Sequence, residues 1–241
     1  MARAETATAD VDRNDTAPAT QRNLAYQGFR QQIIDARIRP GQFVSQRELM
    51  GLLGMSLAAV REMVPRLEAA GLIRAVPKRG LQVAPVDMKL IRNAWQVRTM
   101  IEREAMLHFA RTATPTVVKE QIAAHEAILE RALAPKSDTS LEKDAQAVDW
   151  GLHDMMVDAI GNEILSEIYR VNSLHVRLIR FDAEALRPMQ VVPAMREHLA
   201  VLQSLAEGRP DEALDRMMAH IGSSKRRVIE VMTQTGGHLP A

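Results

Sequence analysis

Residues 45–71, SQRELMGLLGMSLAAVREMVPRLEAAG, constrain the fold most, because they carry the signals of two short helices joined by a tight turn. Ser45 and Glu48 have the spacing of a capping box, in which each side chain satisfies a backbone N–H of the first helical turn. Gly54 is placed to end that helix, and Ser56 can cap the next one. In the second helix apolar residues recur at helical spacing, and a glycine supplies the stop. The stretch predicts a helix-turn-helix, which can place its second helix in the DNA major groove.

The residues on either side extend this prediction to a winged helix. Short apolar or alternating runs at 72–76 and 81–86 are separated by Pro77-Lys78-Arg79-Gly80, which indicates a β-hairpin with a basic tip. Upstream, residues 24–38 predict one more amphipathic helix, closed by Arg39-Pro40-Gly41.

With these elements in view, the sequence resembles the GntR family of bacterial transcription regulators. The matching residues, which cover most of positions 22–86, are Arg39-Pro40-Gly41, Ser45-Gln46-Arg47-Glu48-Leu49, Leu53-Gly54-Met55-Ser56, Val60-Arg61-Glu62, Leu67-Glu68-Ala69-Ala70-Gly71-Leu72-Ile73 and Arg79-Gly80.

The resemblance implies which residues contact DNA. Arg47 and Arg61 match positions that resemble the family's DNA-contacting arginines, and Lys78 and Arg79 lie at the basic tip. Gly80 matches the wing-tip glycine, which allows a close backbone approach to a groove. The alternative for each cation is a surface side chain that touches nothing.

Two departures from the family pattern affect DNA readout. The chain has Leu57-Ala58-Ala59 where the family commonly places an Arg or other polar residue, then Thr and Pro, so base contacts from this turn are expected to be poorer. Pro65 falls inside the second helix, where it removes a backbone hydrogen bond and is expected to kink the axis.

The charge is distributed unevenly along the chain. Residues 21–86 hold ten Lys or Arg against four Asp or Glu, whereas residues 87–241 hold nineteen against twenty-two. In isolation, a solvated basic face would be the better explanation of this surplus. Its coincidence with the helix-turn-helix and the wing favours phosphate binding.

The ends and the composition limit the class of protein. Residues 1–20 lack apolar periodicity and predict a disordered tail without a signal peptide. No run of about 18 apolar residues is present to span a bilayer, so we expect a cytoplasmic protein with no membrane partner. The absence of Cys excludes disulfides, thiolate ligands and Cys nucleophiles.

From residue 87 the patterns are long and helical, without a strand signal, and predict an antiparallel bundle in a mostly α fold. The expected helices lie at about 87–112, 115–134, 140–160, 162–182, 190–207 and 211–235, with residues 236–241 as a flexible C-terminus.

One acid and three histidines of this bundle suggest metal chemistry. Asp149 and His153 are four residues apart, which places both on one helix face. His198 and His220 lie at similar distances on either side of the 208–211 turn, so an antiparallel helix pair brings them to one level. Such a set suits a divalent transition metal, Zn first, with Ni, Mn or Fe as alternatives. Each His could instead be an ordinary hydrogen-bonded residue, the reading kept for His108, His125, His175 and His238.

Residues 87–235 resemble the FCD effector domain of the FadR-type branch of the GntR family. That resemblance implies that Asp149, His153, His198 and His220 bind the metal, and that Arg98 faces an anionic effector. The alternative for Arg98 is an ion pair with Glu102, four residues on.

The expected function is a homodimeric, non-enzymatic regulator that binds double-stranded operator DNA, with repression relieved by a small carboxylate or sugar acid. One rival is a metal-dependent hydrolase or lyase with Glu197 as base. Another is a DNA-binding module whose metal is purely structural.

Overall fold

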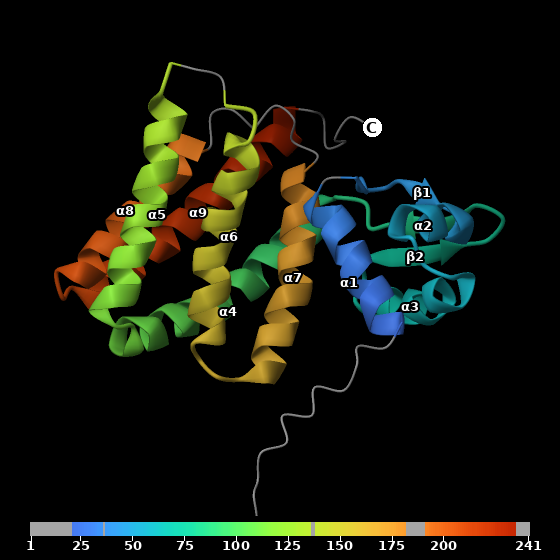
Figure 1. Cartoon of the computed structure of the whole chain (residues 1–241), viewed down its shortest axis with the longest axis horizontal. Helices are drawn as coiled ribbons and strands as arrows, with labels where there is room; N and C mark the ends of the chain where they lie inside the picture. The colour runs from blue at the N-terminus through green and yellow to red at the C-terminus, as the bar shows by residue number, and fades with distance from the viewer. Residues whose placement is uncertain (1–20, 36, 136–137, 182–190, 235–241) are drawn as a thin grey trace, which may run out of the picture.

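The computed structural model describes residues 21–35, 37–135, 138–181 and 191–234. The expected tail at 1–20 and the expected flexible end at 236–241 lie outside these residues. A small N-terminal domain, here called the head (residues 21–86), lies at one end of the molecule, and the helical bundle (residues 87–234) lies at the other (Figure 1).

The head is a winged helix-turn-helix, as expected. Its helices and strands are α1 (Gln21–Ile34), β1 (Phe43–Val44), α2 (Gln46–Leu53), α3 (Leu57–Ala69), β2 (Ile73–Val76) and β3 (Gly80–Val83). The antiparallel strands have the order β1-β3-β2. The capping box is confirmed: the N–H of Ser45 donates to Glu48 Oε2 at 2.6 Å, and the N–H of Glu48 donates to Ser45 Oγ at 3.1 Å. Gly54 ends α2 with a φ of 63°.

The first helix ends earlier than its apolar pattern suggests, at Ile34 rather than Ile38. The backbone N–H groups of Arg37 and Ile38 both donate to the carbonyl of Gln32, at 2.9 and 3.3 Å, so the chain wraps around the helix end. This wrap turns Ile38 into the head core, where it is fully buried. Burial of one large side chain therefore outweighs continuation of the helix.

Strand β1 was not expected from the sequence, and it explains Gly80. That glycine has a φ of +91°, and a Cβ on it would lie 3.1 Å from the carbonyl oxygen of Val44. The close backbone approach is thus made to β1 within the head. At the hairpin tip, the N–H of Arg79 donates to the carbonyl of Val76 at 3.0 Å, and Lys78 adopts a φ of 62°.

The bundle contains the expected helices, with ends close to those expected. They are α4 (Met88–Thr112), α5 (Pro115–Leu133), α6 (Leu141–Asp158), α7 (Glu163–Phe181), α8 (Val191–Ala206) and α9 (Pro210–Gln234). Helix α8 packs against α5 and α9, and α4 packs against α6, α7 and α9. No strand occurs in the bundle residues that the structure describes. Across the described helices, none is long and apolar enough to cross a membrane.

Helix α7 joins the two domains (Figure 1). Tyr169, Val176 and Ile179 pack in the bundle core, whereas Leu174 and Leu178 pack in the head core. Two polar contacts reinforce this packing against α3. Nε2 of His175 lies 2.9 Å from the carbonyl oxygen of Ala70, and Nη2 of Arg66 lies 3.0 Å from Oε1 of Glu167. The end of α3 is therefore fastened directly to the bundle.

Candidate metal centre and DNA-binding surface

The structure brings together the four residues proposed from the sequence as metal ligands. Asp149 and His153 come from α6, His198 from α8 and His220 from α9. One ligand atom from each residue lies within 4.8 Å of all the others. All four side chains are buried, with at most 4% of their surface exposed. These residues are called the Asp/His cluster below.

The outer nitrogen of His198 is held by a second imidazole. Nδ1 of His198 lies 3.1 Å from Nε2 of His125, a buried residue of α5. Nδ1 of His125 lies 2.7 Å from the backbone carbonyl oxygen of Gln121. A carbonyl can only accept, so His125 donates from Nδ1, and its Nε2 accepts the proton of His198 Nδ1. Nε2 of neutral His198 is left with a lone pair directed toward the cluster.

The outer nitrogen of His220 is held by a carboxylate. Nδ1 of His220 lies 2.7 Å from Glu197 Oε2, and Nη1 of Arg227 lies 3.1 Å from Glu197 Oε1. Burial raises the pKa of Glu197, but hydrogen bonds to His220 and Arg227 outweigh it and lower the pKa. An ionised Glu197 fixes the Nδ1 proton of His220. Glu197 contacts Nδ1 of His220, on the edge of the ring that faces away from the cluster. This position suits a residue that orients the ring rather than a general base that activates water.

The inner nitrogens of these two rings face each other. Nε2 of His198 lies 3.1 Å from Nε2 of His220. In the neutral tautomers set by their outer partners, both atoms carry lone pairs, which repel at this distance. A cation between them, either a metal ion or a proton, removes the repulsion. The arrangement therefore fits a metal ligand set.

The third imidazole also lies against a carboxylate, at ion-pair distance. Nδ1 of His153 lies 2.8 Å from Oε2 of Glu102 on α4. Oε1 of Glu102 accepts from Arg98 Nε at 2.7 Å and from the Tyr169 hydroxyl at 2.9 Å. Burial raises the pKa of Glu102, yet Arg98 and His153 bring it down to about 2. Glu102 is thus an ionised anchor beneath the cluster.

Burial also favours the neutral form of two imidazoles of the Asp/His cluster. It lowers the pKa of His153, and it lowers that of His198 well below its usual value, with the neighbouring His220 adding to the effect. Neutral imidazole is the form that binds metal. Oδ1 of Asp149, 3.8 Å from Nε2 of His198, could supply an anionic ligand. Tetrahedral zinc with bonds near 2.0–2.1 Å needs ligand atoms roughly 3.3 Å apart, whereas the candidate atoms lie within 4.8 Å of one another, so the side chains would have to move closer to hold it.

Of the two arrangements considered from the sequence for Arg98, the structure contains the ion pair with Glu102. Arg98 is 1% exposed, and its Nη2 also lies 2.9 Å from Nε2 of His153. The guanidinium therefore borders the Asp/His cluster.

Three residues around the cluster were not identified from the sequence. His125 was treated as an ordinary histidine, Glu102 only as a partner of Arg98, and Tyr169 not at all. Their spacing relative to the ligands carries no signal, since they lie on α4, α5 and α7 and meet the cluster only through packing.

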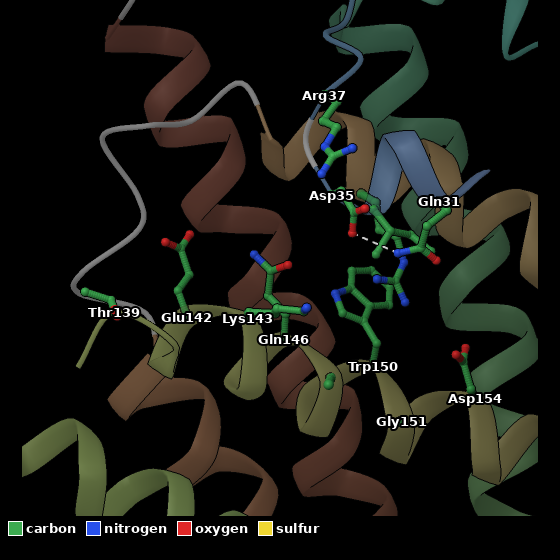
Figure 2. A pocket seen from close by; sticks show the side chains of 13 residues that line it. Gln31, Asp35, Arg37, Thr139, Glu142, Lys143, Gln146, Trp150, Gly151 and Asp154 are labelled. Carbon is green, nitrogen blue, oxygen red and sulfur yellow. Dashed lines mark hydrogen bonds between the residues drawn. The ribbon is translucent and has the colours of Figure 1, made fainter. Parts of the chain in front are cut away.

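A pocket of about 650 Å³ lies between the head and the bundle (Figure 2). Its lining from α1 includes Gln31 and Ile34, and its lining from α6 includes Lys143 and Trp150. Trp150 also packs beside Arg98, whose guanidinium carbon lies 5.3 Å from its ring centre. None of the cluster residues lines the pocket, but its lining includes Trp150 and Asp154, which follow Asp149 and His153 directly along α6.

The predicted DNA-contact side chains lie on the head, away from the bundle. Arg47, Arg61, Lys78 and Arg79 are all exposed. Nε of Arg61 donates to Gln46 at 3.3 Å, and the guanidinium of Arg79 stacks 3.8 Å above the ring of Phe43. The hairpin tip points to the end of the head farthest from the bundle (Figure 1).

Comparison with known proteins agrees with this architecture. The family model described as "Bacterial regulatory proteins, gntR family" matches residues 21–83, and the FCD domain model matches residues 93–223. The HTH-type transcriptional repressor RspR of Escherichia coli is 26% identical over 214 residues, which cover 88% of this chain and 89% of that protein.

Solved structures share the fold. Escherichia coli McbR/YncC superposes with a TM-score of 0.75 at 16% identity, over 88% of this chain and 98% of that one. A GntR regulator from Rhodococcus gives a TM-score of 0.70 at 18% identity, over 87% and 98%. With a winged-helix head of the GntR type and an FCD bundle spanning more than half of its length, this chain belongs to the GntR family of DNA-binding transcription regulators.

Proposed function

We propose that this regulator binds operator DNA as a homodimer and releases it when a small organic acid binds beside a metal in the bundle. The observation that carries the sensory part is the Asp/His cluster, in which two imidazole lone pairs face each other at 3.1 Å. This buried group of possible metal ligands lies in a bundle that is attached to a DNA-binding head. It therefore favours a sensory role for the bundle over a purely structural role.

The DNA contacts proposed are made by Arg47, Arg61, Lys78 and Arg79. One short recognition helix reads too few bases to select a site, and a two-fold dimer on a palindromic operator solves this. Positive charge on the head supplies the phosphate attraction. RspR, a relative of this chain, is named a repressor, and we propose the same sign of regulation here.

The residues present suit a divalent transition metal, with Asp149, His153, His198 and His220 as its ligands. Bound there, the metal would supply a Lewis-acidic position for an effector oxygen. The acid can change DNA affinity only if it binds one dimer arrangement better than the other.

The proposal is tested by selecting bound fragments from a random DNA library with the full-length protein. Their affinity is then measured with and without chelation against a panel of carboxylates and sugar acids. We expect a two-fold symmetric site, and weaker binding with one acid only when metal is present. Operator affinity that no acid changes, combined with loss of the fold on chelation, would support a structural metal instead. Consumption of an acid, abolished by His220→Ala, would support an enzyme.

A further inference from the structure

Arg98 and a metal ion require the same lone pair. Nη2 of Arg98 lies 2.9 Å from Nε2 of His153. A guanidinium only donates hydrogen bonds, so Nε2 is the acceptor. Nδ1 of the same ring faces Glu102 at 2.8 Å. Nε2 is therefore the nitrogen left for a metal, and one lone pair cannot both accept a hydrogen bond and coordinate an ion.

Arg98 is also only partly satisfied. Its Nε donates to Glu102 at 2.7 Å, which fixes the guanidinium in place. Its Nη1 is buried and has no hydrogen-bond partner among the residues that the structure describes. Loss of the contact to His153 would leave both terminal nitrogens free, in the fork geometry that binds a carboxylate through two parallel hydrogen bonds.

We propose that Arg98 is a gate that makes anion binding depend on the metal. Without metal, His153 holds Nη2. Metal loading displaces Nη2 from His153, and the released guanidinium becomes a carboxylate-binding fork next to the ion. This inference rests on the proposed metal site and adds an order of binding to it, with the metal first and the acid second. Because binding linkage is reciprocal, the anion also strengthens metal binding.

The first test measures Zn²⁺ affinity calorimetrically for the metal-stripped, full-length wild type and for Arg98→Lys. Lysine keeps the positive charge and can pair with Glu102, but it lacks the fork. Since the hydrogen bond to His153 no longer has to be broken, we expect metal affinity to rise about tenfold. Arg177→Lys is the matched control, because the guanidinium carbon of Arg177 lies 4.1 Å from the ring centre of Trp150 and this residue lines the pocket. Unchanged or weaker metal binding by Arg98→Lys overturns the gate.

A second measurement uses the wild type alone and does not depend on how the variant folds. A ¹⁵N–¹⁵N coupling across the hydrogen bond between Arg98 and His153 should be present in the metal-free protein and lost on adding Zn²⁺. Persistence of that coupling in the Zn²⁺-loaded protein overturns the gate. Failure of the wild type to bind any metal is a separate result, which removes the proposed metal site itself.

The anion is tested with acetate, a small carboxylate that any fork able to hold an effector carboxylate admits. We expect Zn²⁺ to bind the wild type more tightly in acetate than in chloride at equal ionic strength, after correction for zinc acetate formation. Arg98→Lys should lose this gain. An equal gain in both proteins would assign the effect to the metal alone and overturn the role of the fork.

Discussion

Nε2 of His198 and Nε2 of His220 face each other at 3.1 Å, while the outer nitrogen of each ring already donates to another residue. Without a metal, the pair needs a proton between the rings, and it must hold that proton in a site where burial lowers the pKa of His198. The same two atoms become compatible once an ion lies between them.

Chelation should therefore lower the midpoint of thermal unfolding. A metal at a hundredfold excess over its Kd stabilises the folded state by about 2.7 kcal/mol, and that increment is lost when the metal is removed. Calorimetry with and without added Zn²⁺ measures it. His220→Ala should show almost no zinc-dependent shift, whereas His108→Ala, a histidine outside the Asp/His cluster, should shift like the wild type. Equal shifts in both variants would contradict the site.

His125 should control metal affinity without touching the metal. His125→Phe removes the acceptor for His198 Nδ1, so His198 can adopt the tautomer with its proton on Nε2. Loss of such an outer partner costs about 10- to 100-fold in metal affinity. His125→Gln keeps an acceptor oxygen and should recover most of the affinity. If His125→Phe and His125→Gln bind zinc with equal affinity, the affinity depends on packing around residue 125 and not on a hydrogen-bond acceptor there. The tautomer argument would then be wrong.

Lys78 should show opposite effects on stability and on DNA binding. Lys78 has a φ of 62°. This backbone conformation costs a residue with a side chain roughly 1 kcal/mol, whereas glycine adopts it freely. Lys78→Gly should therefore unfold no more easily than the wild type, yet bind operator DNA more weakly, with a salt dependence reduced by about one phosphate contact. Lys78→Arg retains the charge and should keep the wild-type salt dependence. An unchanged salt slope in Lys78→Gly would place Lys78 away from the phosphates.

His175 should contribute a pH dependence to stability. Burial lowers its pKa from 6.5, so below pH 6.5 the unfolded chain takes up a proton that the folded protein refuses. Stability contributed by neutral His175 is present above that pH and falls as the pH drops toward the folded-state pKa.

The measurement is the difference in unfolding midpoint between wild type and His175→Gln as a function of pH. Glutamine can donate to the Ala70 carbonyl at every pH, so the variant should gain relative to the wild type as the pH falls below 6.5. A difference that stays constant with pH would show that His175 does not titrate in this range.

The sequence was a good guide wherever a local signal fixes the backbone. The capping box at Ser45 and Glu48 and the glycine at Gly54 depend on neighbouring residues alone, and the helix expected from residue 115 was found, beginning at Pro115. Asp149 and His153 could be paired because helical spacing places them on one face. The end of α1 was misjudged because Ile38 is buried by a wrap that only the packed head explains.

Apart from the pairing of His198 with His220 across the 208–211 turn, contacts between helices were beyond the reach of the sequence. That His125 meets His198, and that Glu102 meets both His153 and Tyr169, depends on how α4, α5 and α7 rotate against their neighbours. The pocket between head and bundle has the same origin, since its walls come from α1 and α6.

Helix α7 places Leu174 and Leu178 in the core of the head, although both residues belong to the FCD segment of the chain. A fragment cut at residue 86 would thus carry an apolar gap where that helix belongs. The boundary between sequence families and the boundary between folding units do not coincide here. In this protein, which combines two domain families, the helix that connects the domains contributes residues to the hydrophobic core of each.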